Sequence, residues 1–111
     1  MYLYVSEYKI LIETLKKVQF DKTVERNFSL GCFEVINKLN ANTKQIKIEG
    51  SKKKVVRIKI KNKRDIEQCM VVINRILEKE SIELDMDKIT IDNILSKVLI
   101  GLYDMLPSSK V

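Results

Sequence analysis

Apolar residues near the start of the chain recur at three- and four-residue steps, the spacing that lines one face of a helix. They are Tyr8, Leu11, Ile12, Leu15 and Val18. Charged residues occupy the opposite face, so we predict a helix over residues 7–19 with Ser6 as its N-cap. Residues 2–5, Tyr-Leu-Tyr-Val, fit either a short strand or the lead-in to this helix.

Residues 21–42 carry two competing patterns. Phe28, Leu30 and Cys32 alternate as in a strand, whereas a longer set of apolar residues suits one helical face. That set is Val24, Phe28, Cys32, Val35, Ile36 and Leu39. Gly31 disfavours either structure by about 1 kcal/mol relative to alanine. We predict an extended first part and a helical segment over residues 33–39, with the helical face as the alternative.

Two alternating runs surround Gly50-Ser51, a turn sequence that accepts positive φ. This pattern predicts a β-hairpin at about residues 44–61. Since side chains alternate along a strand, we expect one set to face the core: Ile46, Ile48, Val56, Ile58 and Ile60. The opposite set, expected in water, is Lys47, Arg57, Lys59 and Lys61.

Two further helices are predicted after the hairpin. Asn62 caps the first, at about residues 63–80, which carries an apolar stripe. The stripe contains Ile66, Cys69, Met70, Ile73, Ile76 and Leu77. The second, at about residues 91–106, ends before Pro107 and is apolar around most of its circumference. Such a helix is either central in the fold or shared with a partner. We predict a partner interface at Val98, Leu99 and Leu102, and a homodimer that associates through this helix.

These elements predict an α+β fold: a small antiparallel sheet built around a lysine-rich β-hairpin, packed against about three amphipathic helices. The 111 residues suffice for a single domain, residues 1–111, with a core that needs no metal or disulfide. No targeting segment is present, and no run reaches the ~18 apolar residues of a membrane span. We therefore expect a cytoplasmic protein with no membrane partner.

The positive charge of the chain is concentrated in one stretch. Residues 44–64 hold ten basic residues and one acid, a net +9, whereas the whole chain is +6 and the rest therefore sums to −3. Like charges this close repel unless a polyanion neutralises them, and nucleic acid is the commonest such polyanion. The residues predicted to bind it are Lys47, Lys52, Lys53, Lys54, Arg57, Lys59, Lys61, Lys63 and Arg64.

Three alternatives exist for this stretch: a solvated face that protects a sheet edge, an acidic protein partner, or a membrane surface. No aromatic residue lies among the basic ones, so stacking of bases on this face is not supported. Lysine outnumbers arginine here and lacks the fork that reads guanine. We expect phosphate contacts to DNA or RNA with little sequence preference.

Enzymatic chemistry has little support in the sequence. The chain has no histidine, so the commonest general base is absent and neither cysteine has an imidazole partner. Two cysteines cannot complete a zinc site, and both Cys32 and Cys69 are predicted to be buried free thiols. We predict a non-enzymatic binding protein without a cofactor. The alternative is a regulatory protein-interaction module, such as an adaptor, a complex subunit or a viral inhibitor, that acts through its last helix.

Overall fold

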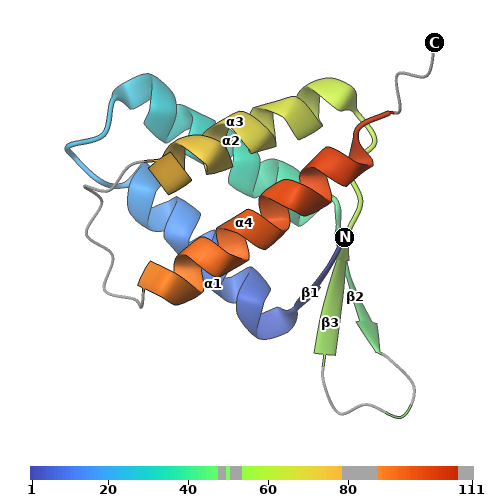
Figure 1. Cartoon of the computed structure of the whole chain (residues 1–111). Helices are drawn as coiled ribbons and strands as arrows, with labels where there is room; N and C mark the ends of the chain where they lie inside the picture. Colours follow the sequence, from blue (N-terminus) through green and yellow to red (C-terminus); the bar gives the residue numbers. More distant parts are fainter. Residues whose placement is uncertain (48–49, 51–53, 79–87, 108–111) are drawn as a thin grey trace.

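The structure, a computed structural model, describes residues 1–47, 50, 54–78 and 88–107 (Figure 1). These residues form three strands and four helices. They are β1 (Tyr2–Tyr4), α1 (Val5–Gln19), α2 (Arg26–Ala41), β2 (Thr43–Lys47), β3 (Lys54–Ile58), α3 (Lys63–Glu78) and α4 (Lys88–Met105). The predicted α+β class and the antiparallel sheet are confirmed, but the described residues contain four helices rather than about three.

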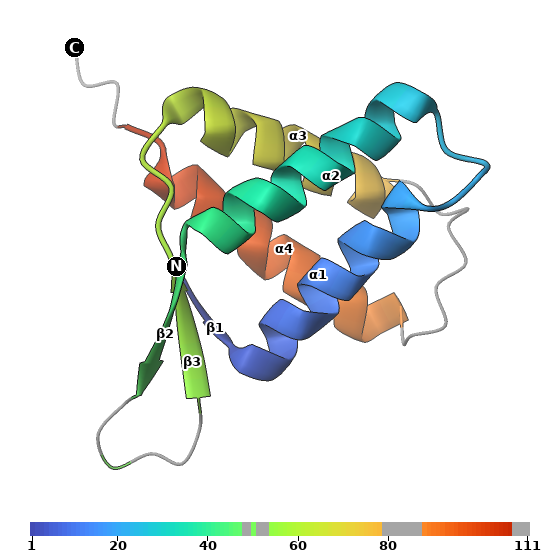
Figure 2. The ribbon, with the colours of Figure 1, turned by 180° about the vertical axis from the view of Figure 1, so that it is seen from behind.

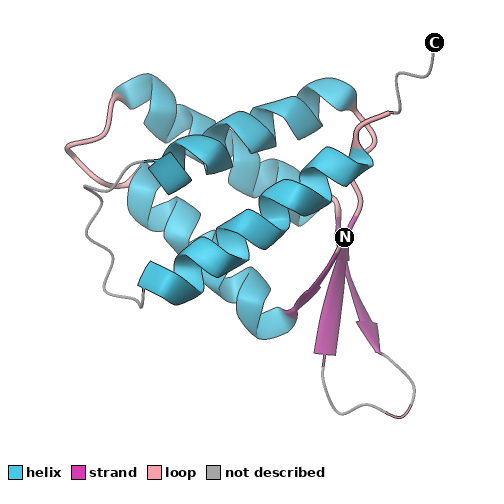
Figure 3. Ribbon diagram, in the orientation of Figure 1, coloured by secondary structure: helices cyan, strands magenta, loops and turns pink. Residues whose placement is uncertain are grey.

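The helices form one packed group, and the strands project from one end of it (Figures 2 and 3). α1 packs against α2 and α4, while α3 packs against α2 and α4. The apolar stripes meet in the middle of this group, where Leu11, Cys32, Ile73 and Val98 are fully buried. The stripes read from the sequence for residues 7–19 and 63–80 therefore face the core, although Tyr8, Ile12, Met70 and Leu77 are only half-buried.

The extended backbone predicted at the start of residues 21–42 is wrong. α2 is one continuous helix, and the alternative helical pattern accounts for its buried face: Phe28, Cys32, Val35, Ile36 and Leu39. Gly31 lies where α2 faces α3, and a Cβ built there would lie 3.4 Å from the Val72 side chain, an ordinary van der Waals distance. Burial of the apolar face of α2 thus outweighs the low helix propensity of glycine.

The helix starts are fixed by local hydrogen bonds. Asn62 caps α3 as predicted, because its side-chain oxygen accepts the backbone N–H of Arg64 at 2.9 Å. Ser6, by contrast, does not cap α1, which already begins at Val5. The carboxylate of Glu7 instead accepts the backbone N–H of Tyr4 at 2.9 Å, so the strand β1 passes directly into the helix.

The sheet has the strand order β1-β3-β2, with both neighbouring pairs antiparallel. β2 and β3 pair as antiparallel strands, and Gly50, which lies between them in the chain, has a φ of 78°, a value that suits glycine. The rest of the predicted turn and Ile48 lie outside the described residues. β1 supplies a third strand, which a two-stranded hairpin needs to be stable.

The predicted orientation of β2 is wrong. Val56 and Ile58 are buried in the core as expected, but the register places Ile46 opposite Val55, on the other side of the sheet. Gln45 is the residue opposite Val56. The sequence shows the alternation within each strand, whereas the pairing register decides which parity of β2 faces the core.

We expect alanine substitution to separate the two sides of the sheet. Ile58→Ala should lower the free energy of unfolding by roughly 2–5 kcal/mol, because Ile58 is fully buried in the core. Ile46→Ala should cost no more than about 1 kcal/mol, since Ile46 is only half-buried on the outer face. Urea unfolding measures both values. Equal costs would contradict this register.

Candidate nucleic-acid interface

The outer face of the sheet, the side turned away from the core residues Leu3, Val56 and Ile58, carries two rows of side chains. Directly paired residues share a face, so Tyr2, Arg57 and Lys44 form one row across the three strands. Tyr4, Val55 and Ile46 form the next row. Adjacent strands lie about 4.8 Å apart, so each row is compact. We call this surface the outer sheet face.

A cleft of about 290 Å³ lies at the end of this face near the first row. Four basic residues line it together with Ala41, Asn42 and Thr43; they are Lys44, Arg57, Lys59 and Lys61. We call these four residues the basic cleft. None of the described residues that line the cleft is acidic.

Three of the four basic side chains of the cleft, those of Arg57, Lys59 and Lys61, alternate with buried residues along the chain. Ile58 and Ile60 are buried in the core, and the residues between and beside them therefore point away from it. Lys59 and Lys61 are exposed, as predicted, whereas Arg57 is half-buried rather than fully in water. Apolar burial of the two isoleucines thus holds the basic side chains in place.

The backbone of the cleft is tied down at the corner between α2 and β2. The side chain of Asn42 donates to the Lys38 carbonyl at 2.7 Å, and the Thr43 hydroxyl donates to the Leu39 carbonyl. The Lys59 N–H donates to the Asn42 carbonyl at 3.0 Å, which holds the segment after β3 against the start of β2. The cleft therefore rests on paired backbone rather than on a free loop.

The basic cleft has no acidic partner among the residues that the structure describes. Lysines elsewhere do form ion pairs. The Lys38 ammonium lies 3.0 Å from the Asp65 carboxylate, and the Lys97 ammonium lies 3.1 Å from the Glu7 carboxylate. Within the described parts of the chain, no member of the basic cleft makes such an ion pair. An anionic ligand could therefore contact these basic groups without first displacing a carboxylate of the described residues.

Of the predicted binding residues, only Arg57, Lys59 and Lys61 are among the described residues that line the cleft. Lys54 is exposed at the far end of β3, where the register pairs it with Lys47. Lys63 and Arg64 begin α3, and Lys63 lies 3.8 Å from Glu67. Lys52, Lys53 and the side chain of Lys47 lie outside what the structure describes. Lys44 belongs to the basic stretch but was not among the predicted binding residues, because its place opposite Arg57 follows only from the register.

A second surface feature is an apolar groove of about 500 Å³ between α3 and α4. We call it the α3–α4 groove; it is lined by Met70, Val71, Asn74, Leu99, Ile100 and Tyr103. Two of the three residues predicted for a partner interface are not on it. Val98 and Leu102 are 0% exposed and fill the core of this chain, because α4 lies across both α1 and α3. Only Leu99, which is half-buried, reaches the groove.

Neither cysteine is placed for catalysis. Cys32 and Cys69 are buried free thiols, as predicted. Burial raises the pKa of Cys69 to about 11, although the nearby Lys38 ammonium opposes this effect. Within the described residues, no three His, Cys, Asp or Glu side chains gather closely enough to hold a metal ion. None of the helices in these residues combines the length and the apolar composition needed to cross a bilayer.

Comparison with known proteins provides no functional assignment: no family model matches the chain, and no similar curated protein or solved structure is found. The site must therefore be interpreted from its own geometry.

We expect both thiols to resist modification in the folded protein. A thiol with a pKa of about 11 stays protonated at pH 8, and Cys32 and Cys69 are both buried. A thiol-specific disulfide reagent should react with neither cysteine in native buffer and with both in concentrated urea. Rapid reaction of one thiol in native buffer would show that α2 or α3 opens locally.

Proposed function

We propose that this chain is a non-enzymatic protein that binds nucleic acid through phosphate contacts at the basic cleft. One observation carries the proposal: Lys44, Arg57, Lys59 and Lys61 line a single cleft, and none of its described lining residues is acidic. Phosphate oxygens are strong acceptors for guanidinium and ammonium groups. Four such groups that converge on one hollow suit a chain of phosphates better than a single small anion.

The arrangement also sets the kind of binding. Three of the four groups are lysines, which act as point charges, and Arg57 is half-buried in the row between Tyr2 and Lys44. The cleft therefore suits contacts to the backbone rather than to the hydrogen-bonding edges of bases in a duplex groove. Each phosphate neutralised releases a counterion, so binding should weaken steeply as salt rises.

The basic cleft is tested by reversing three of its charges. The variant Arg57→Glu/Lys59→Glu/Lys61→Glu should bind labelled oligonucleotides at least about tenfold more weakly at low salt, because three phosphate contacts become repulsive. The slope of log affinity against log salt should also become shallower by about 2 on single strands. Fluorescence anisotropy across a salt series measures both effects.

The matched control reverses one arginine and two lysines elsewhere. Lys16, Lys22 and Arg26 are exposed and lie around the connection between α1 and α2, at the opposite end of the helices from the sheet (Figure 1). Their triple glutamate variant changes the net charge by the same amount and should keep most of the affinity. If both variants lose binding equally, the interaction follows net charge alone and the cleft is not a site.

Self-association through the α3–α4 groove is a second candidate, and its occupant would be the same groove of a second copy. The groove is apolar, with Ile100 64% and Tyr103 67% exposed. Exposed charges one helical turn from its lining residues have both signs, Glu67 and Arg75 on α3 and Asp104 on α4. Two copies related by a two-fold axis could therefore pair this face without like-charge repulsion.

Light scattering tests this candidate. The parent chain should show twice the mass of one chain, and Ile100→Lys should return it to a monomer by placing a charge in the apolar contact. Ile89→Lys is the control, since Ile89 is 71% exposed on the same helix but does not line the groove. A parent chain that stays monomeric at every concentration would exclude the self-associating form.

A further inference from the structure

Two tyrosines lie on the outer sheet face beside the basic cleft. Tyr2 is paired with Arg57 and is 59% exposed, and Tyr4 is paired with Val55 and is 44% exposed. Both come from β1, more than fifty positions before Arg57 in the chain. Strand pairing thus brings aromatic rings next to basic residues that have no aromatic neighbour in their own segment.

The tyrosines belong to an apolar surface that is separate from the core. Val55 is only 6% exposed, yet it is not part of the buried cluster that contains Val56 and Ile58. The Val55 side chain is therefore shielded from solvent by its neighbours on the outer sheet face. The register makes Tyr4 and Ile46 its cross-strand neighbours there. A shallow depression of about 250 Å³ lies alongside, lined by Tyr2, Leu3, Tyr4, Val55 and Lys97.

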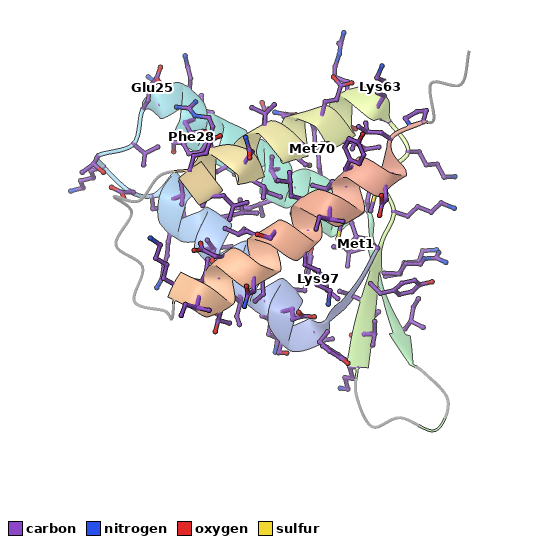
Figure 4. The ribbon with its side chains drawn as sticks, in the orientation of Figure 1. Met1, Glu25, Phe28, Lys63, Met70 and Lys97 are labelled. Atoms are coloured by element: carbon purple, nitrogen blue, oxygen red, sulfur yellow. The ribbon has the colours of Figure 1, made fainter. Side chains whose placement is uncertain are left out.

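The two rings differ in their surroundings. The ammonium of Lys97, the residue labelled in Figure 4, lies 5.7 Å from the centre of the Tyr4 ring. It also pairs with Glu7, and this holds the Tyr4 ring near the start of α1. Tyr2 is the more exposed of the two and lies in the same row as Arg57 and Lys44. It is therefore the ring best placed to contact a ligand held at the basic cleft.

We propose that the ligand is single-stranded nucleic acid, with a base stacked on Tyr2 while its phosphates contact Arg57 and the lysines of the basic cleft. This inference rests on the proposed function and narrows its ligand. Bases in a duplex stack on one another and offer no free face, whereas the bases of a single strand can stack on exposed aromatic rings. The combination of a basic cleft with an adjacent aromatic ring is the arrangement that single-strand binding requires.

This geometry revises the expectation that stacking is not supported. Residues 44–64, on which that expectation was based, contain no aromatic residue. The sheet adds Tyr2 and Tyr4 from the start of the chain to the same face. Every base has a flat face, so stacking on Tyr2 adds affinity with little sequence preference. The expected lack of sequence specificity is thus retained.

The experiment compares single-stranded and duplex oligonucleotides of one sequence, as both DNA and RNA, by fluorescence anisotropy at fixed low salt. The parent chain should bind the single strand more tightly. Tyr2→Ala should weaken single-strand binding roughly 5- to 100-fold, the usual effect of losing one stacked base, and should leave the weaker duplex binding nearly unchanged. Tyr2→Phe keeps the ring and should retain most of the affinity.

Phe20→Ala is the matched control. Phe20 is 74% exposed, but it lies at the C-terminal end of α1, at the opposite end of the helices from the sheet (Figure 1). Its loss should leave binding unchanged, and thermal melting of each variant verifies that the fold survives.

Two different negative results can be distinguished. Equal binding of single strand and duplex, with no effect of Tyr2→Ala, would overturn stacking and leave backbone binding intact. No salt-dependent binding of either form would overturn the proposed function and stacking together.

Discussion

The pairing of β1 with β3 is the interaction on which the rest of this structure depends. The amino group of Met1 donates to the Ile58 carbonyl at 3.1 Å, and the Ile58 N–H donates back to the Met1 carbonyl at 2.8 Å. These bonds continue the register that sets Tyr2 beside Arg57 and Leu3 beside Val56. The first residues of the chain thereby complete a sheet whose other two strands, β2 and β3, begin at Thr43 and Lys54.

This pairing has consequences on both sides of the sheet. On the inner side it adds Leu3 to the core beside Val56 and Ile58, and so anchors a highly charged segment to the helices. On the outer side it places Tyr2 in the row of Arg57 and Lys44. Hydrophobic burial on one face thus offsets the repulsion among basic residues concentrated on the other.

Much of the fold could be predicted from the sequence where one pattern dominated. The apolar stripes of α1 and α3, the Asn62 cap and the alternation along β3 all follow from local spacing. The first half of α2 was predicted to be extended because Phe28, Leu30 and Cys32 also alternate and Gly31 weakens a helix. Packing of the apolar face of α2 against α1 and α3, a tertiary effect, decides in favour of the helix.

The candidate site could be predicted only in part, for a similar reason. The charges of Arg57, Lys59 and Lys61 are visible in the sequence, but their grouping with Lys44 in one cleft depends on the register of β2. Tyr2 could not be associated with them, because no local pattern links residues so far apart in the chain. The exposure of α4 was likewise misjudged, since only packing against α1 and α3 decides that Val98 and Leu102 are buried while Ile100 is not.

The most direct test of this account is amide chemical-shift mapping by NMR during titration with a single-stranded oligonucleotide at low salt. The account predicts that the largest shifts fall on Tyr2, Lys44, Arg57 and Lys59, from three strands of one sheet face. Amides around Tyr103 and the connection between α1 and α2 should stay unchanged. Shifts confined to the α3–α4 groove, or no shifts at any ratio, would contradict it.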